Sequence, residues 1–423
     1  MSSPRDHLPP RLSVDDIHRL IRHLSLPLPT SVEALQVTAA FHSIYLLNYP
    51  ASTPAIEALL PAGGAHSRQQ RRRRRRPDGS TTTTTTLVLR ISGNHIPRIK
   101  TVNEVATMTW VREHTSIPVP AVVAWDGVGE GTNPLGREFT LLEWVPGRSV
   151  DRMYRDMSEE AKLRLVEQLT DYLVELNGFE WHHVGGLRFD ADGRVAPGRF
   201  LDDTFWLLPD VERLWPPRGG QQQQQEEVSI DTLNPRGPFA SHAAFIAGYV
   251  ECFIRGIDAH PSLAWLRDTI PRLRALADLL PRLPSLAATR LVLAHKDMHH
   301  ANVMALEDGT ITGVLDWEFA GVVPAHRWDA ARAFLHPWTG EPDDVQEREK
   351  ARMMRVFEGV LERKGVAPWW RLEAVHDDGV TEDVWTVVRF TRALVEVCPR
   401  GQKADKVADW RRAVEDALSR LGV

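Results

Sequence analysis

Three side chains that carry oxygen follow one another near residue 300 of the chain. Asp297 comes directly after a short apolar segment that is typical of a strand, and Asn302 lies five residues further on. A second such segment reaches Asp308-Gly309, a pair typical of tight hairpin turns, and the returning strand ends at Asp316. The hairpin therefore predicts that Asp297, Asn302 and Asp316 lie together at one edge.

These residue types suit the transfer of a phosphoryl group. The barrier to that reaction is lowered mainly by positioning the reactants and by neutralising charge on the phosphates, which is the part that Mg²⁺ plays. Mg²⁺ prefers oxygen ligands, which the Asp316 carboxylate and the Asn302 amide supply. Asp297 would accept or orient the proton of an acceptor hydroxyl. The order H-K-D-x-x-x-x-N differs by one residue from the H-R-D-x-x-x-x-N loop of protein kinases.

Each of these residues has a simpler explanation when it is taken alone. A single Asp after a strand is usually a turn residue or a helix cap, but this leaves the joint order of the three side chains unexplained. His295 and His299 stand four residues apart, a spacing that occurs in zinc sites. The loop has no H-E-x-x-H motif and no nearby cysteine, which argues against zinc, and His295 is expected to bond the loop backbone.

The elements that must hold these residues fall into two groups. Up to residue 146 the pattern predicts strands with two helices, and after Pro146-Gly147 it predicts mostly helices. We therefore expect an α+β protein with a β-rich N-terminal lobe over residues 1–146 and a larger helical C-terminal lobe over residues 147–423. The expected strands cover 40–47, 87–91, 121–125 and 139–143, and the expected helices cover 13–25, 101–114, 158–176, 242–257, 265–280, 346–364, 382–397 and 403–421.

Two low-complexity tracts interrupt these lobes. Arg71–Arg76 and Thr81–Thr86 offer no apolar side chains for a core, so residues 52–84 are predicted to form a disordered insertion. Gln221–Gln225 indicates a second, flexible insertion over residues 217–236. The arginine run also fits a nuclear signal or an RNA-binding patch, but the threonine tract beside it favours a solvated expansion.

Composition indicates the broad class of protein. Of the 423 residues, 43% are hydrophobic and 25% are charged, which is typical of a globular chain with about two domains or lobes. The net charge of −5 includes the arginine run, so the remainder is more acidic, which argues against nucleic-acid binding through a broad basic face. Cys252 and Cys398 are expected to be free thiols. We expect a cytoplasmic protein that has no membrane segment, and no feature indicates a protein partner.

Several further segments occur in the order found in a known family. The chain resembles the aminoglycoside phosphotransferase family, also called the choline/aminoglycoside kinase-like group, and within it a large fungal branch. The resemblance extends over residues 34–330. It depends on Asn103–Ala106, Thr115–Pro120, Leu142–Ser149, the H-K-D-M-H-H-A-N loop over residues 295–302, and Ile311–Gly321.

The resemblance implies a bilobal protein-kinase-like fold and a Mg²⁺-dependent transfer of the γ-phosphate of ATP or GTP to a hydroxyl of a small molecule. It makes Asp297 the catalytic base, and Asn302 and Asp316 the magnesium ligands. Arg90, in place of the commoner lysine, would face the nucleotide phosphates, and Glu104 would brace it. The segment that binds adenine through its backbone would be Glu143, Trp144 and Val145.

Some positions leave alternatives open. The loop that should cover the phosphates, Val37–Ser43, contains no glycine, so the chain could instead be a catalytically silent kinase-like module that binds a nucleotide or another ligand. Glu104 stands three residues after Thr101 and fits a helix capping box equally well. A protein kinase is disfavoured, because only 13 positions separate Asp316 from Asp329 and no A-P-E follows.

The sequence does not indicate the acceptor. Trp206, Trp215 and Trp338 fall in the lobe where an acceptor pocket is expected, and one or two of them would line it. Asp329 matches an acidic residue of the family and is expected to have a structural role.

Overall fold

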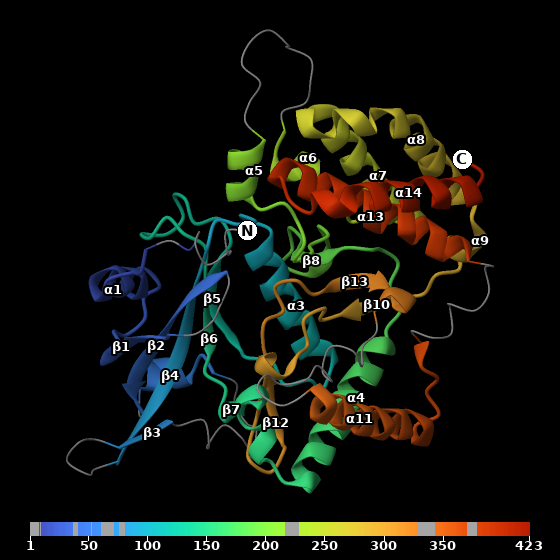
Figure 1. The fold of residues 1–423 in the computed structure, drawn as a ribbon. Helices are drawn as coiled ribbons and strands as arrows, with labels where there is room; N and C mark the ends of the chain where they lie inside the picture. The colour runs from blue at the N-terminus through green and yellow to red at the C-terminus, as the bar shows by residue number, and fades with distance from the viewer. Residues whose placement is uncertain are drawn as a thin grey trace.

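The computed structural model describes residues 8, 10–36, 41–51, 53–60, 72–75, 81–215, 228–328, 343–369 and 379–423. Two lobes make up the molecule, one built on an antiparallel sheet and a larger one that is mainly helical (Figure 1). The expected α+β, bilobal architecture is confirmed, while the boundary at residue 146 stays a prediction.

The sheet of the N-terminal lobe has the strand order β1-β2-β4-β6-β5, with β3 paired to β4. Apolar side chains from β2, β4 and β6 form a buried core with the apolar stripe of helix α1 (Val14–His23), which begins with the predicted capping box of Ser13 and Asp16. The strands are β1 (Ser31–Ala34), β2 (His42–Pro50), β3 (Arg72–Arg75), β4 (Thr81–Ser92), β5 (Val122–Asp126) and β6 (Phe139–Glu143).

Helix α3 (Lys100–His114) lies between this sheet and the C-terminal lobe, where it contacts β8 (Gly186–Phe189) (Figure 1). Thr101 is not its cap, because the helix already includes Lys100 and its first turn has no side-chain cap. Instead, the Thr101 hydroxyl lies 3.1 Å from the Ser92 hydroxyl of β4. The capping-box explanation of Glu104 is therefore wrong, since a contact between elements occupies Thr101.

Two small sheets position the residues near 300: β10 pairs with β13, and β11 pairs with both β12 and β7. The predicted hairpin turn is confirmed. Gly309 has a φ of +83°, and a Cβ there would overlap the carbonyl of Ala161, so both the turn and the close approach require glycine. The strands are β7 (Arg148–Ser149), β10 (Leu291–Ala294), β11 (Val303–Ala305), β12 (Ile311–Val314) and β13 (Gly321–Pro324), and β8 pairs separately with β9 (Val195–Gly198).

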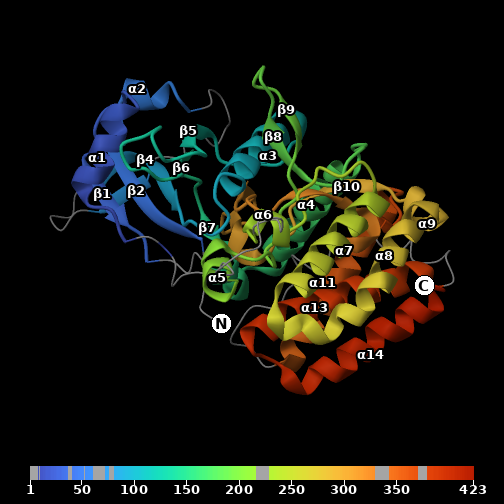
Figure 2. The same ribbon diagram turned by 90° about the horizontal axis from the view of Figure 1, so that it is seen from above.

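Helices form most of the C-terminal lobe, with α7, α8, α13 and α14 side by side (Figure 2). The helix expected over 265–280 is in part wrong, because Pro261–Thr269 forms a 3₁₀ segment and α8 starts anew at Ile270, with Pro271 in its first turn. The helices are α2 (Pro54–Glu57) in the N-terminal lobe and, in the C-terminal lobe, α4 (Glu159–Asn177), α5 (Leu208–Leu214), α6 (Ile230–Leu233), α7 (His242–Ala259), α8 (Ile270–Leu279), α9 (Pro284–Ala287), α11 (Asp343–Arg363), α13 (Val380–Arg400) and α14 (Ala404–Arg420).

Both predicted insertions contain ordered parts. Within residues 52–84, Ile56 of α2 is fully buried in the core of the sheet, and Thr84 belongs to β4, where it pairs with Pro50. Within residues 217–236, Leu233 of α6 is buried. The prediction of disorder or flexibility is wrong for these segments because apolar contacts and strand pairing hold them, and residues 61–71, 76–80 and 216–227 lie outside the described residues.

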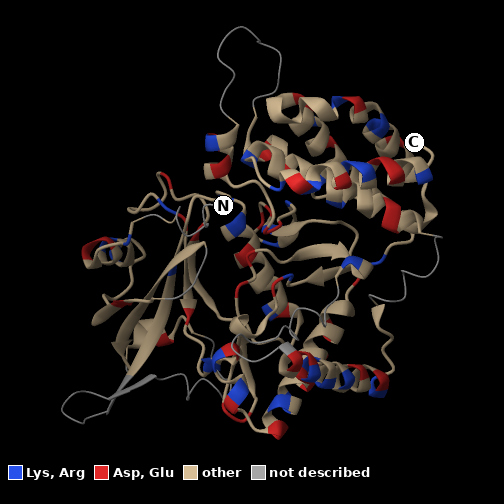
Figure 3. Ribbon diagram, in the orientation of Figure 1, with Lys and Arg blue, Asp and Glu red and all other residues tan. Residues whose placement is uncertain are grey.

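The described surface of the C-terminal lobe mixes both signs of charge. Lys and Arg alternate with Asp and Glu along α11 and α14 (Figure 3), in pairs such as Arg352–Glu349 and Arg411–Glu415. None of the described helices is long and apolar enough to span a membrane. Cys252 and Cys398 are free thiols, as expected.

Candidate active site

The loop after β10 places Asp297 and Asn302 in contact. Asn302 Nδ2 donates to the Asp297 carbonyl at 2.9 Å and to Asp297 Oδ2 at 3.3 Å. His295 is buried, with Nε2 2.8 Å from the Leu315 carbonyl, while its Nδ1 accepts the Asp297 N–H at 3.2 Å. His295 therefore bonds the loop backbone, as expected. Within the part of the chain that the structure describes, no cluster of His, Cys, Asp and Glu could hold a metal ion by itself.

Asp297 is held in its charged form. Burial alone would raise the pKa of this carboxyl, but His299, whose Nε2 lies 3.5 Å from Asp297 Oδ1, together with His295 and Asn302, lowers the pKa below its usual value. The side chain remains about half exposed, with 51% of its surface accessible, and it lines a cavity. A charged, accessible carboxylate is what a proton acceptor requires.

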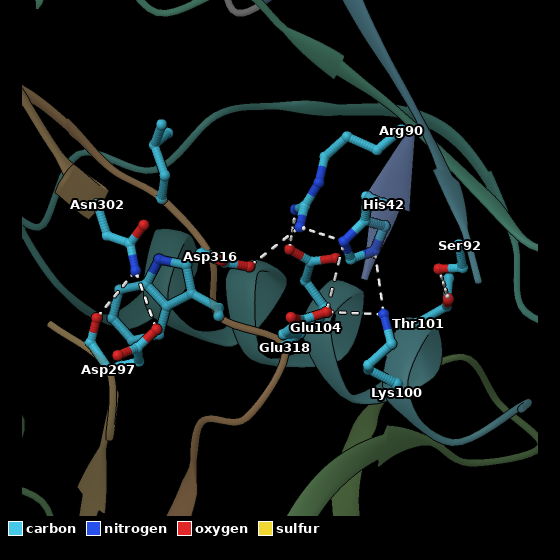
Figure 4. A network of polar contacts seen from close by, with 12 residues as sticks. His42, Arg90, Ser92, Lys100, Thr101, Glu104, Asp297, Asn302, Asp316 and Glu318 are labelled. Carbon is cyan, nitrogen blue, oxygen red and sulfur yellow. Dashed lines mark hydrogen bonds and ion pairs between the residues drawn. The ribbon is translucent and has the colours of Figure 1, made fainter. Parts of the chain in front are cut away.

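Asp316 is brought beside this loop by the hairpin. Leu315 N donates to the Asn302 carbonyl at 2.8 Å, so the end of the returning strand is bonded to the start of the hairpin. Asp316 itself has a φ of +67°, a left-handed conformation that is uncommon outside glycine. The predicted convergence of the Asp297, Asn302 and Asp316 side chains is present in the structure (Figure 4).

Arg90 connects Asp316 to the N-terminal lobe. Its Nη2 donates to Asp316 Oδ1 at 3.0 Å, and its Nη1 donates to Glu104 Oε1 in a short contact (Figure 4). Burial alone would lower the pKa of Arg90, but Glu104 and Asp316 raise it above the usual value. Of the two explanations for Glu104, the contact with Arg90 is thus the one that the structure shows.

Sequence reasoning missed three polar residues next to Arg90. Lys100 Nζ donates to Glu318 Oε2 at 2.7 Å, and the ring of His42 lies between Lys100 and Arg90, 3.1 Å from each (Figure 4). Glu318 follows Asp316 by two residues, which is a signal that could have been used. His42 is far from these residues in the sequence, and only the pairing of β2 with β4 brings it to Arg90.

The segment between β6 and β7 joins the lobes and lines the same cavity through Glu143, Trp144 and Val145. The Glu143 side chain is buried and accepts the Ala121 N–H at 3.0 Å. Val145 packs on Gly313 of β12, where a Cβ would come within 2.7 Å of it. The path of this segment is therefore fixed on both sides.

The cavity has a volume of about 1420 Å³ and reaches from the sheet to helix α13. At the end away from the sheet it is lined by Asp202, Asp203, Tyr249 and Trp385. Burial and the neighbouring Asp202 raise the pKa of Asp203 to about 6. Charged and aromatic groups thus share this end of the cavity.

Two of the three expected tryptophans are not lining residues. Trp206 and Trp215 are buried against each other in the core, with ring centroids 5.3 Å apart, and neither lines the cavity, so the expectation that one or two of the three tryptophans line an acceptor pocket now depends on Trp338. Trp338, Asp329 and residues 37–40 of the expected phosphate loop lie outside the described residues.

Comparison with known families identifies the group to which the chain belongs. Residues 60–369 match the profile of the phosphotransferase enzyme family, APH. The chain is a member of this family. The match includes Arg90, Glu104, Asp297, Asn302 and Asp316, whereas His42 and Trp385 lie outside it.

Two curated relatives of this phosphotransferase family member come from fungi. The chain is 28% identical over 236 residues to the clavilactone A biosynthesis cluster protein Y of Ampulloclitocybe clavipes, covering 53% of this chain and 51% of that protein. It is 29% identical over 160 residues to a subtelomeric hrmA-associated cluster protein of Aspergillus fumigatus, covering 36% of this chain and 28% of that protein. The chain thus spans about half the length of the first relative and less of the second.

Among solved structures, the chain is similar to the GDP complex of wild-type aminoglycoside 2'-phosphotransferase-IIIa, with 12% identity, 97% of this chain and 99% of that chain covered, and a TM-score of 0.43. It is also similar to the streptomycin-ATP-APH(2")-IIa ternary complex, with 13% identity, 97% of each chain covered and a TM-score of 0.44. The family assignment depends on the profile match and not on these structures.

Proposed function

We propose that this phosphotransferase moves the γ-phosphate of ATP or GTP to a hydroxyl group of a small molecule and that it requires Mg²⁺. The observation that carries the proposal is the convergence of Asp297, Asn302 and Asp316 on one cavity between the lobes, with Asp316 bonded to Arg90. The free thiols Cys252 and Cys398 support a reducing compartment, and we propose the cytoplasm.

The oxygens present fit a magnesium ion. Among the described residues, neither Asn302 Oδ1 nor Asp316 Oδ2 makes a hydrogen bond, since Asn302 bonds Asp297 through its nitrogen and Asp316 bonds Arg90 through Oδ1. Mg²⁺ is commonly held by one or two such oxygens together with substrate phosphates and water, so it needs no larger cluster of side chains. When bound, the ion would neutralise charge on the phosphates.

In the reaction, Asp297 would accept the proton of the acceptor hydroxyl as the acceptor oxygen forms its bond to the γ-phosphorus. The bond from that phosphorus to the bridging β-phosphate oxygen breaks, and the nucleoside diphosphate leaves. The lowered pKa of Asp297 keeps its carboxylate free of a proton before the reaction. Arg90, braced by Glu104, would face the phosphates, and the backbone of Glu143, Trp144 and Val145 would bind the base.

The test is calorimetric binding of ATP and of GTP, with and without Mg²⁺, to the wild type and to Asp316→Ala. We expect Mg²⁺ to strengthen nucleotide binding in the wild type and to have no effect in the variant. A thermal shift provides a second readout, because nucleotide at about 100 times its Kd adds about 2.7 kcal/mol of stability. An acceptor screen with the wild type then follows.

If neither nucleotide binds to the wild type, the proposed reaction is wrong. The glycine-free loop over Val37–Ser43 would then support the alternative, a catalytically silent kinase-like module that binds another ligand. Nucleotide binding without turnover on any acceptor would leave a silent nucleotide-binding module.

A further inference from the structure

One face of α3 contacts both Arg90 and the segment that follows Asp316. Lys100 Nζ bonds the Glu318 carboxylate at 2.7 Å, and Asn103 Nδ2 donates to the carbonyls of Glu318 at 3.0 Å and Ala320 at 2.9 Å. Glu104, one residue further on the same face, bonds Arg90. The helix thus holds the backbone that follows Asp316 and also the guanidinium that bonds the Asp316 side chain.

His42 on β2 lies between the two cations of this group. Its Nδ1 is 3.1 Å from Arg90 Nη2 and 3.6 Å from Glu318 Oε2, and its Nε2 is 3.1 Å from Lys100 Nζ. Burial, followed by the charges of Arg90 and Lys100, lowers the pKa of His42 well below its usual value, so the ring is neutral and offers one lone pair. Arg90 and Lys100 both carry donors, so the ring can accept a hydrogen bond from only one of them. The position of Lys100 therefore affects whether His42 accepts a hydrogen bond from Arg90.

This group is buried, whereas the carboxylate that it supports is accessible. His42, Lys100, Glu104 and Glu318 are between 1% and 5% exposed, and buried charges of this kind are stable only when paired. The Asp316 side chain is 33% exposed and lines the cavity. Its left-handed backbone conformation persists only if neighbouring contacts fix it, and Asn103 and Lys100 supply those contacts through Glu318.

We propose that His42, Lys100 and Glu318 are positioning residues that fix Arg90 and Asp316 for the complex of metal and nucleotide. This inference rests on the proposed phosphotransferase function. The three residues act through the guanidinium of Arg90 and the backbone of Asp316. They therefore control how much Mg²⁺ strengthens nucleotide binding, which a purely structural ion pair would not do.

The test is the double variant Lys100→Met/Glu318→Met. Removing both members of a buried ion pair leaves no unpaired charge, and such replacements are often neutral for folding. The nucleotide Kd is measured by calorimetry with and without Mg²⁺, together with the Tm. The matched control is Arg400→Met/Asp210→Leu, which removes a 3.0 Å ion pair between α13 and α5 whose two side chains are each 14% exposed.

We expect the gain in nucleotide affinity on adding Mg²⁺ to fall by about 10- to 100-fold in the double variant, the usual effect of losing a residue that orients a metal ligand. The control should keep the full gain. A folded double variant that also keeps the full gain overturns the inference. A wild type that binds nucleotide with no Mg²⁺ gain overturns the proposed function instead, and the inference with it.

If the double variant does not fold, Glu318→Gln takes its place in the same measurement, because it keeps the volume of the side chain and replaces the carboxylate by a neutral amide. We again expect a reduced Mg²⁺ gain. An unchanged gain in Glu318→Gln overturns the inference.

Discussion

At the scale of single residues, the neighbours of Asp297 determine what it can do. His299 and Asn302 restrain its carboxylate and stabilise the charged form, while about half of the side chain faces the cavity. An amide at this position would keep the shape and lose the ability to take a proton.

We predict that Asp297→Asn lowers kcat by about 10²–10⁴, the usual contribution of a positioned base, and leaves nucleotide affinity unchanged. The measurement is steady-state kinetics on an acceptor found by screening, combined with calorimetric nucleotide binding. Asp258→Asn, on an exposed part of α7, is the control and should keep full activity. An unchanged kcat in Asp297→Asn would show that the assigned role is wrong.

The residues whose convergence the sequence predicted share a local signal. Asp297, Asn302 and Asp316 lie within one hairpin, so spacing alone brings them together. His42, Lys100 and Glu318 lie in three segments far apart in the chain, and their contacts depend on how β2, α3 and the turn between β12 and β13 pack. Apart from the nearness of Glu318 to Asp316, no pattern in the sequence would reveal these contacts.

At the scale of elements, the hairpin depends on the glycine at its turn. A Cβ on Gly309 would meet the carbonyl of Ala161 in α4, in addition to the cost of placing alanine at a φ of +83°. Gly365, which follows α11, has a φ of +65° but nothing within 4 Å of its Cβ position. The two glycines therefore separate the cost of the backbone conformation from the cost of the close contact.

We predict that Gly365→Ala lowers the free energy of unfolding by about 1–2 kcal/mol, from the backbone term alone. Gly309→Ala should lower the free energy of unfolding by a further amount of about 1–3 kcal/mol, because the added methyl group forces the hairpin away from α4. Urea denaturation of the two variants and the wild type measures both values. An equal decrease in the free energy of unfolding of the two variants would contradict the prediction, because it would show that the close contact with α4 adds nothing to the effect of the backbone conformation.

Elements were predicted well where their pattern is local and poorly where packing decides. β6 has the predicted bounds, Phe139–Glu143, because its run of apolar residues is clear. The cap of α3 was predicted wrongly, because Thr101 bonds Ser92 on a neighbouring strand. The prediction of disorder in residues 52–84 fails for Ile56, which packs in the core of the sheet, because the prediction depended on the polar tracts further along the segment.

At the scale of the whole molecule, buried histidines link folding to pH. Burial, together with His326 and Arg327, lowers the pKa of His242 from 6.5 to about 3. The unfolded chain binds a proton below about pH 6.5, whereas the folded chain binds none at this site until about pH 3. The free energy of unfolding therefore decreases as the pH falls through this window.

We predict that His242→Asn, which keeps a polar group near Thr289, makes the stability of the protein less dependent on pH between 6.5 and 4. The slope should decrease by at most about 1.4 kcal/mol per pH unit, the value for one proton. Urea denaturation at several pH values measures the slope. His23→Asn, on the exposed surface of α1, is the control, and equal slopes in both variants would contradict the prediction.

The way in which α3 is attached has a consequence for regulation. In protein kinases, the position of the helix that carries the glutamate partner of the active-site cation is a means of control. Here α3 is bonded to the C-terminal lobe, since Asn103 Oδ1 also accepts the Leu187 N–H at 2.7 Å. An outward rotation of α3 would break this bond, and it would separate the buried Lys100 from the Glu318 carboxylate and leave both charges unpaired. For the proposed phosphotransferase activity, we therefore expect that no separate activation step follows folding and that the rate depends on the supply of nucleotide and acceptor.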